Sequence, residues 1–302
     1  MKRAILCTLI AAALLLSACT RASESTVRAP DAGAPLTLCL GAGPAALDPA
    51  RTENGVGATY VVNLFAGLTG YRAGGDGKAE LTPELCAALP EPESLPDGRV
   101  QYVFTLRDGL TWSDGTPLTA ADFVYAWKRL VSPNTASPNA AILSVVSGYD
   151  EARAGDVDAL QVSAPDDHTL EVTLTGPCAY FLNSVCTAPA TMPVRQKAVE
   201  GDDDWASSRT YFVGNGPFRR GGDWTDYHRL TLHKQEGHYS AKHISLDRVE
   251  LVLQTEEQAA ANAGRVDVVV GASSDPAVSG GDPTVGLLLV NQMATNLEKN
   301  GL

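Results

Sequence analysis

The stretch 98–133 constrains the fold most, because it specifies a strand, tight turns and a helix in immediate succession. Apolar and polar residues alternate in VQYVFTL, which predicts a strand with one buried face. Two Asp-Gly pairs then predict a compact strand-turn-strand. Thr119 is expected to cap a helix over 120–131, and the charge of Asp122 suits its first turn.

Strand and helix patterns also alternate along the rest of the chain, which predicts a mixed α/β (α+β) architecture. Strands are expected over 36–40, 158–176 (a hairpin), 228–235, 247–254, 265–271 and 284–291, and helices over 60–71 and 255–264. At 302 residues and 44% hydrophobic, the chain can bury a core for one large or two modest domains.

The first nineteen residues have the pattern of an export signal. Lys2 and Arg3 precede the apolar run 4–16, which is too short to span a bilayer as a helix. The following LSAC, ending at Cys19, resembles the lipobox of bacterial lipoproteins. The resemblance implies that residues 1–18 are removed and Cys19 is lipidated, with residues 19–35 as a flexible tether. An ordinary secretory signal is the alternative.

Charge and cysteine content fit a protein outside the cytoplasm. The formal net charge of −12 argues against nucleic-acid binding, which requires clustered Lys and Arg. Four cysteines lie beyond the signal: Cys39, Cys86, Cys178 and Cys186. An even number in an exported chain suggests up to two disulfides, and Cys178 with Cys186 is the pair closest along the chain. Four buried free thiols are the alternative.

No motif in the sequence supports a catalytic or cofactor site once the residues around it are considered. GAGPAA at 41–46 fits a dinucleotide fingerprint, but Pro44 occupies the phosphate-binding turn and no helical period follows. No Walker, GxSxG or HExxH motif occurs, and the acidic run 200–205 lacks the ligand spacing of an EF-hand. We therefore expect no enzyme activity, no cofactor and no metal.

Four histidines recur every five residues: His228, His233, His238 and His243. Residues five apart on a strand face opposite sides, so His228 and His233 cannot share a metal ion without a bend. We interpret them as surface histidines on a polar strand and loop. Metal binding stays open as the alternative.

Four segments together resemble the bacterial solute-binding proteins of oligopeptide ABC importers, solute-binding family 5. They are the stretch from YVFTLRDGLTWSDG to NTASPNA (102–140), LDPARTENGVGATYVVNLFAGL (47–68), VGNGPFRRGGDW (213–224) and HYSAKHISLDRVELVLQ with its continuation to Gly271. Their order also matches, and coverage runs over about 36–291.

The resemblance implies a periplasmic-binding-protein-like (type II) lobe that is discontinuous in sequence. Its two parts would be 36–66 and 187–291, with a smaller α+β domain, 67–186, inserted between them. Trp112 and Trp127 would belong to the core of this insertion. Relatives continue into a second lobe, so 292–302 would be its truncated start, in a fragment of a longer product or a degenerate copy.

The resemblance also implies a ligand and a site. The family clamps an extended peptide between its lobes through main-chain hydrogen bonds. Glu53, Asn54 and Gly55 would offer such bonds, while Asn215 and Gly216 would form the cleft wall, where Gly216 permits close backbone approach. The alternative for each of these five residues is that it lies in a turn and makes no ligand contact.

The implied function is that of a monomeric, lipid-anchored component at the cell surface or in the periplasm. It would bind oligopeptides and deliver them to an ABC permease in the membrane. The same fold binding nickel or another non-peptide solute, and a truncated remnant with no ligand, are the alternatives. An exported hydrolase would need a nucleophile or metal constellation that the sequence lacks.

Overall fold

The computed structural model describes residues 35–40, 46–52, 55–74, 78–202, 204–208, 211–221, 229–253 and 268–270. Among these residues, no helix combines the length and apolarity needed to span a bilayer. The predicted signal, Cys19 and residues 19–34 of the predicted tether lie outside them, as do residues 292–302, the predicted helix 255–264 and the predicted strand 284–291.

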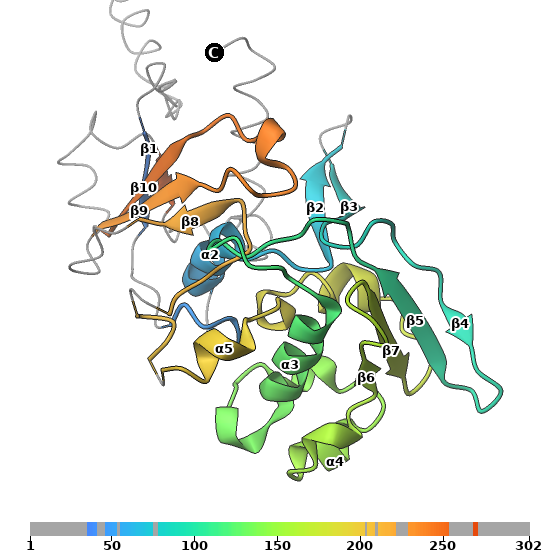
Figure 1. The fold of residues 1–302 in the computed structure, drawn as a ribbon. Helices are drawn as coiled ribbons and strands as arrows, with labels where there is room; N and C mark the ends of the chain where they lie inside the picture. Colours follow the sequence, from blue (N-terminus) through green and yellow to red (C-terminus); the bar gives the residue numbers. More distant parts are fainter. Residues whose placement is uncertain are drawn as a thin grey trace, which may run out of the picture.

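A five-stranded sheet forms one part of the molecule (Figure 1). Its strand order is β11 (Val268–Val270), β1 (Leu36–Leu40), β10 (Arg248–Leu253), β9 (Arg229–Lys234) and β8 (Phe218–Arg220). β1 runs parallel to β10 and β11, whereas β9 pairs antiparallel with β10 and β8. These strands confirm the sequence patterns at 36–40, 228–235, 247–254 and 265–271.

Helix α2 (Gly55–Leu64) lies between this sheet and the rest of the molecule, with Tyr60, Val61 and Leu64 fully buried. The helix predicted over 60–71 was therefore only partly right. The chain leaves the helix after Leu64, whose carbonyl accepts a hydrogen bond from the Gly216 backbone N–H at 2.9 Å. A contact distant in sequence thus satisfies a helix-terminal carbonyl.

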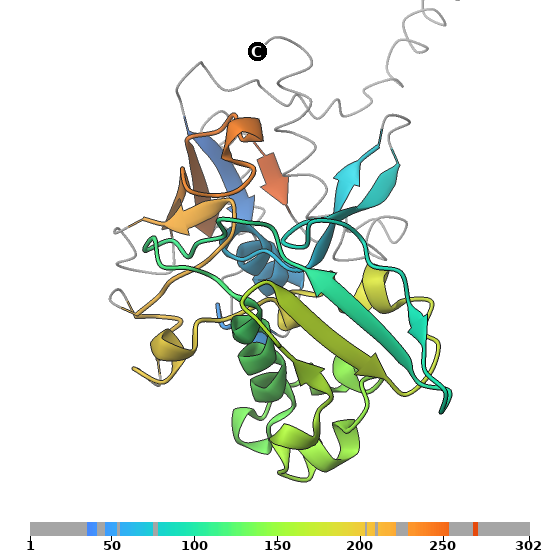
Figure 2. The ribbon, with the colours of Figure 1, turned by 45° about the vertical axis from the view of Figure 1, so that its right-hand side comes forward.

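Beyond that helix, β2 (Thr69–Ala73) pairs antiparallel with β3 (Ala79–Pro83). A four-stranded sheet follows in the order β4 (Glu93–Ser94), β5 (Val100–Thr105), β7 (Thr169–Leu174) and β6 (Val162–Ser163). This confirms the alternating strand of the opening stretch and the predicted hairpin. Figure 2 shows the sheet beside helix α3 (Ala120–Val131).

Helix α3 begins and ends where the sequence predicts. The Asp122 carboxylate accepts a hydrogen bond from the Thr119 backbone N–H at 2.9 Å, so the expected reach-back contact is present. Its apolar face buries Phe123, Trp127 and Leu130 against β6 and β7. Shorter elements complete this region: η3 (Pro133–Thr135), η4 (Ala140–Leu143), α4 (Tyr149–Arg153), η5 (Val157–Ala159) and a π-helical turn (Phe181–Val185).

We call residues 67–186 the insert and the described residues of 35–66 and 187–270 the sheet half. One continuous cluster of buried side chains runs through both. Trp112 and Trp127 are 1% and 0% exposed, as predicted, and Trp127 Nε1 donates to the carbonyl of Thr191 in the sheet half at 2.8 Å. That carbonyl lies in η7 (Pro189–Thr191), which α5 (Gln196–Val199) follows.

The structure does not contain the predicted Cys178–Cys186 disulfide. Both residues are free thiols, and so is Cys86. The π-helical turn (Phe181–Val185) lies between Cys178 and Cys186. Burial raises the pKa of the Cys186 thiol well above its ordinary value and that of Cys86 to about 11. These two thiols therefore match the alternative of buried small hydrophobes.

Candidate binding site

The predicted site residues lie at opposite ends of α2. Gly55 is the first residue of the helix, whereas Gly216 contacts its last residue, Leu64. At about 1.5 Å per residue, the two ends are roughly 14 Å apart. Glu53 and Asn54 lie outside the described residues. The structure thus brings Asn215 and Gly216 together and places Gly55 away from them.

The Asn215 side chain bonds to the chain just after α2. Its Oδ1 accepts from the Ala66 N–H at 3.2 Å, and its Nδ2 donates to the Ala66 carbonyl at 3.0 Å. This reciprocal pair fixes the NGPF segment against residues 149 positions earlier. One N–H and one lone pair of the amide are not used by these bonds. A ligand contact by Asn215 stays a prediction.

Gly216 does allow a close backbone approach, but the partner is α2. A Cβ at this position would lie 2.5 Å from both the Leu64 carbonyl carbon and the Phe65 nitrogen. Backbone atoms cannot yield as a flexible side chain can, so the contact requires glycine. The close approach at Gly216 is therefore made to the chain's own backbone, and its place in a cleft wall stays a prediction.

The turn that contains Trp112 fastens the insert to this same segment. The Ser113 N–H donates to the Gly214 carbonyl at 2.7 Å, and the Gly214 N–H donates to Ser113 Oγ at 3.2 Å. Next to it, Asp114 forms an ion pair with Arg195 of the sheet half. The conspicuous turn therefore holds the insert and the sheet half together.

A second set of contacts fastens the segment that precedes α2. Arg129 of α3 forms a bidentate ion pair with Asp48, and the Asn139 side chain donates to the Thr52 carbonyl at 2.7 Å. Asp48 caps the short turn η2 (Pro49–Arg51) through the Ala50 N–H at 3.1 Å. Sequence reasoning missed these residues, although an acidic residue before Pro at a turn start is a recognisable capping signal.

The loop after β9 makes a third contact, with the β2–β3 region. Arg72 Nη2 donates to the Tyr239 hydroxyl at 3.4 Å, and the Arg107 guanidinium lies 5.0 Å from the centre of the Tyr239 ring. Burial raises the pKa of the Glu84 carboxyl, while Arg72, the Gly67 backbone and Arg107 oppose that shift. Charged groups therefore gather at this joint between the insert and the sheet half.

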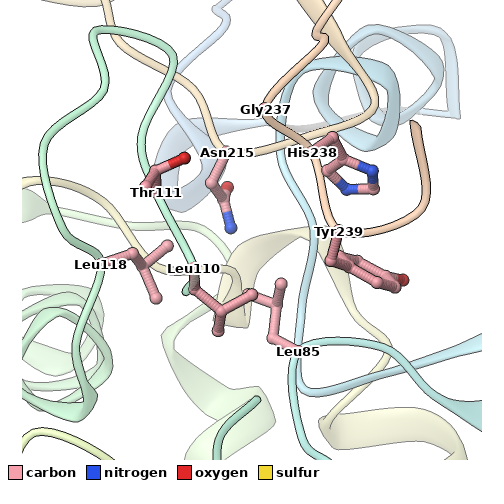
Figure 3. Close-up of a pocket in the computed structure, with 8 residues that line it drawn as sticks. All are labelled: Leu85, Leu110, Thr111, Leu118, Asn215, Gly237, His238 and Tyr239. Atoms are coloured by element: carbon pink, nitrogen blue, oxygen red, sulfur yellow. The ribbon is translucent and has the colours of Figure 1, made fainter. Parts of the chain in front are cut away.

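A small cavity of about 10 Å³ lies at the same joint (Figure 3). Three leucines line one side and polar side chains the other. The insert contributes Leu85, Leu110, Thr111 and Leu118, and the sheet half contributes Asn215, Gly237, His238 and Tyr239.

His238 gives this cavity a neutral hydrogen-bond donor. Its Nδ1 lies 3.3 Å from the Ser240 backbone N–H, which makes Nδ1 an acceptor and places the ring proton on Nε2. That Nε2 is buried and has no partner among the described residues. Burial, helped by Arg72, lowers the pKa of His238 to about 4. The cavity can thus accommodate a small uncharged acceptor such as water.

The described histidines do not form a metal site. His233 lies on β9, His238 lines the cavity and His243 ends η8 (Ala241–His243), while His228 is outside the described residues. Within the part of the chain that the structure describes, no three His, Cys, Asp or Glu side chains are grouped to hold a metal ion.

Residues 80–285 match the family described as bacterial extracellular solute-binding proteins, family 5 Middle. The dipeptide-binding protein DppE of Bacillus subtilis (strain 168) is 34% identical over 215 residues, 70% of this chain and 38% of that protein. The probable deoxycholate-binding periplasmic protein YgiS of Escherichia coli (strain K12) is 37% identical over 243 residues, 78% of this chain and 44% of that protein.

Among solved structures, the substrate-binding domain of an oligopeptide ABC transporter from Bacillus anthracis str. Ames is 28% identical, with a TM-score of 0.66. The match covers 78% of this chain and 45% of that one. The chain thus spans less than half the length of each of these three relatives. The likeness confirms the predicted periplasmic-binding-protein-like (type II), mixed α/β fold.

Proposed function

The chain belongs to family 5 of the bacterial extracellular solute-binding proteins, and from this premise we propose that it binds oligopeptides for an ABC importer. The single observation that carries the proposal is the family match over residues 80–285. The names of two relatives support it, a dipeptide-binding protein and the substrate-binding domain of an oligopeptide transporter. Family 5 proteins are binding proteins, and we assign no catalytic step.

In this proposal the protein acts outside the cytoplasm, as a monomer anchored through a lipid on Cys19, and passes peptide to a membrane permease. The ligand would run as an extended strand near the start of α2, taking main-chain hydrogen bonds from Glu53, Asn54 and Gly55. Asn215 and Gly216 would bound that surface at the other end of α2. Main-chain bonding supports a broad range of peptide side chains.

A second candidate ligand is an amphipathic steroid, because a relative with 37% identity carries the description deoxycholate-binding. Such a ligand has no peptide main chain and would depend on apolar contact instead. The two candidates therefore predict different responses to short peptides and to deoxycholate.

Thermal unfolding of the full chain, with and without ligand, tests the proposal. A ligand at a hundred times its Kd stabilises by about 2.7 kcal/mol, which raises the Tm of a chain this size by roughly 4 °C. We expect that rise with a mixture of di- to pentapeptides, and none with Ni²⁺. A rise with deoxycholate alone would replace peptide by steroid, and no rise with any ligand would refute solute binding by this chain.

A further inference from the structure

We propose that Arg129 is a positioning residue for peptide binding, acting through Asp48 on the segment that leads into α2. This inference rests on the proposed peptide function and assigns part of it to the insert. Arg129 belongs to α3 in the insert, whereas Asp48 stands 81 positions earlier in the sheet half.

The ion pair has the geometry of a specific, desolvated contact. Arg129 Nη1 lies 2.9 Å from Asp48 Oδ1 and Nη2 lies 2.5 Å from Oδ2, so each oxygen has its own donor. The two side chains are 13% and 4% exposed. Arg51 stands 4.0 Å from the same carboxylate but is 52% exposed, so it cannot replace the bidentate partner. Removing Arg129 would leave a buried carboxylate without adequate compensation.

The insert holds the same short segment at two further points. Ser137 Oγ donates to the Ala50 carbonyl at 2.5 Å, and Asn139 Nδ2 donates to the Thr52 carbonyl at 2.7 Å. Within the segment, Thr52 Oγ1 donates to the Asp48 carbonyl at 3.0 Å. Three contacts from one stretch of the insert, 129–139, therefore set the path of residues 48–52.

This path matters because Thr52 stands three residues before Gly55, the start of α2 and a predicted peptide contact. Main-chain hydrogen bonds to a peptide need donors and acceptors that are already in place. If the segment moves freely, only a fraction of molecules can bind, and the apparent Kd rises by the inverse of that fraction. The insert would thus contribute to affinity without touching the ligand.

Arg129→Gln in the full chain tests this, with Lys128→Gln as the matched control. Lys128 is the preceding residue on α3 and pairs with Asp158, whose side chain is 83% exposed. Both variants remove one positive charge from the same helix, but only Arg129→Gln breaks the contact with Asp48. Arg129→Lys keeps the positive charge but loses the paired guanidinium donors that bond to both carboxylate oxygens of Asp48.

Two measurements separate a positioning role from a merely structural one: hydrogen exchange of residues 46–64 without peptide, and peptide Kd by calorimetry. We expect Arg129→Gln to exchange faster in this segment. We also expect it to bind peptide about tenfold more weakly, which is the effect when only about a tenth of the molecules hold the segment in the conformation that binds peptide. Arg129→Lys should recover part of both losses, and Lys128→Gln should match the parent.

Faster exchange with an unchanged Kd would overturn the link to binding, and an unchanged exchange would overturn the positioning itself. If the parent binds no peptide, the proposed function fails first, which the parent titration shows separately. Should Arg129→Gln fail to fold, Ser137→Ala removes one neutral hydrogen bond to the same segment and must show the same pattern on a smaller scale.

Discussion

Gly216→Ala should destabilise the protein strongly, because the new methyl group would meet backbone rather than side chain. The built Cβ lies 2.5 Å from the Leu64 carbonyl carbon and the Phe65 nitrogen and 2.9 Å from the Asn63 carbonyl oxygen. Overpacking of this kind costs about 1–3 kcal/mol, and the upper end applies since all three neighbours are main-chain atoms. We expect a loss of about 3 kcal/mol, or roughly 5 °C in Tm.

Gly176→Ala is the matched control, because a Cβ at that glycine meets nothing within 4 Å. It should be neutral or stabilise by up to about 1 kcal/mol through the unfolded state. Thermal unfolding and peptide titration of both variants decide between two reasons for the glycine. If Gly216→Ala melts within a degree of the parent yet loses peptide binding, the glycine serves the ligand and our packing argument is refuted.

Three further predictions concern buried groups. Trp127→Phe should cost about 2–4 kcal/mol, because it opens a cavity and leaves the Thr191 carbonyl without its donor at 2.8 Å; a loss below about 1 kcal/mol in denaturant unfolding would contradict this. The folded-state pKa of His238, about 4, lies below its ordinary 6.5, so its stabilising contribution is complete above pH 6.5 and is lost as pH falls toward 4. His238→Gln should therefore flatten the fall of Tm between pH 7 and pH 5, and parallel curves for parent and variant would refute the assignment. Cys86 and Cys186 should resist a thiol reagent in the native protein and react in denaturant, so rapid native labelling of either would contradict their burial.

Sequence patterns correctly predicted the helices and strands whose deciding residues lie close together in the chain. The span of α3 followed from its cap, its apolar spacing and the proline that follows it. Strand β5 followed from strict alternation, and its inward residues Val100, Tyr102 and Phe104 are buried. In both cases the residues that decide the structure lie within one element.

Where the deciding contact is distant in sequence, prediction from pattern failed. The apolar spacing at 60–71 continues beyond Leu64, but the helix stops there, where the Gly216 N–H donates to the Leu64 carbonyl. Proximity along the chain suggested a Cys178–Cys186 bridge, whereas the structure has both residues as free thiols. The Asp48–Arg129 pair spans 81 positions, and nothing in the sequence near either residue identifies the other as its partner. Such pairs become visible only when the fold brings the segments together.

The three sets of contacts also decide which parts can move against each other. A hinge between the insert and the sheet half would have to separate Arg129 from Asp48, Ser113 from Gly214, and Tyr239 from the arginines around it. Separating the two regions would also expose part of the continuous apolar core to water, which opposes such a hinge. Solute binding therefore costs less free energy if the insert and the sheet half move as one body. If they do move as one body, the insert contributes to the proposed peptide binding by fixing the segment before α2. This is the role that we propose for Arg129.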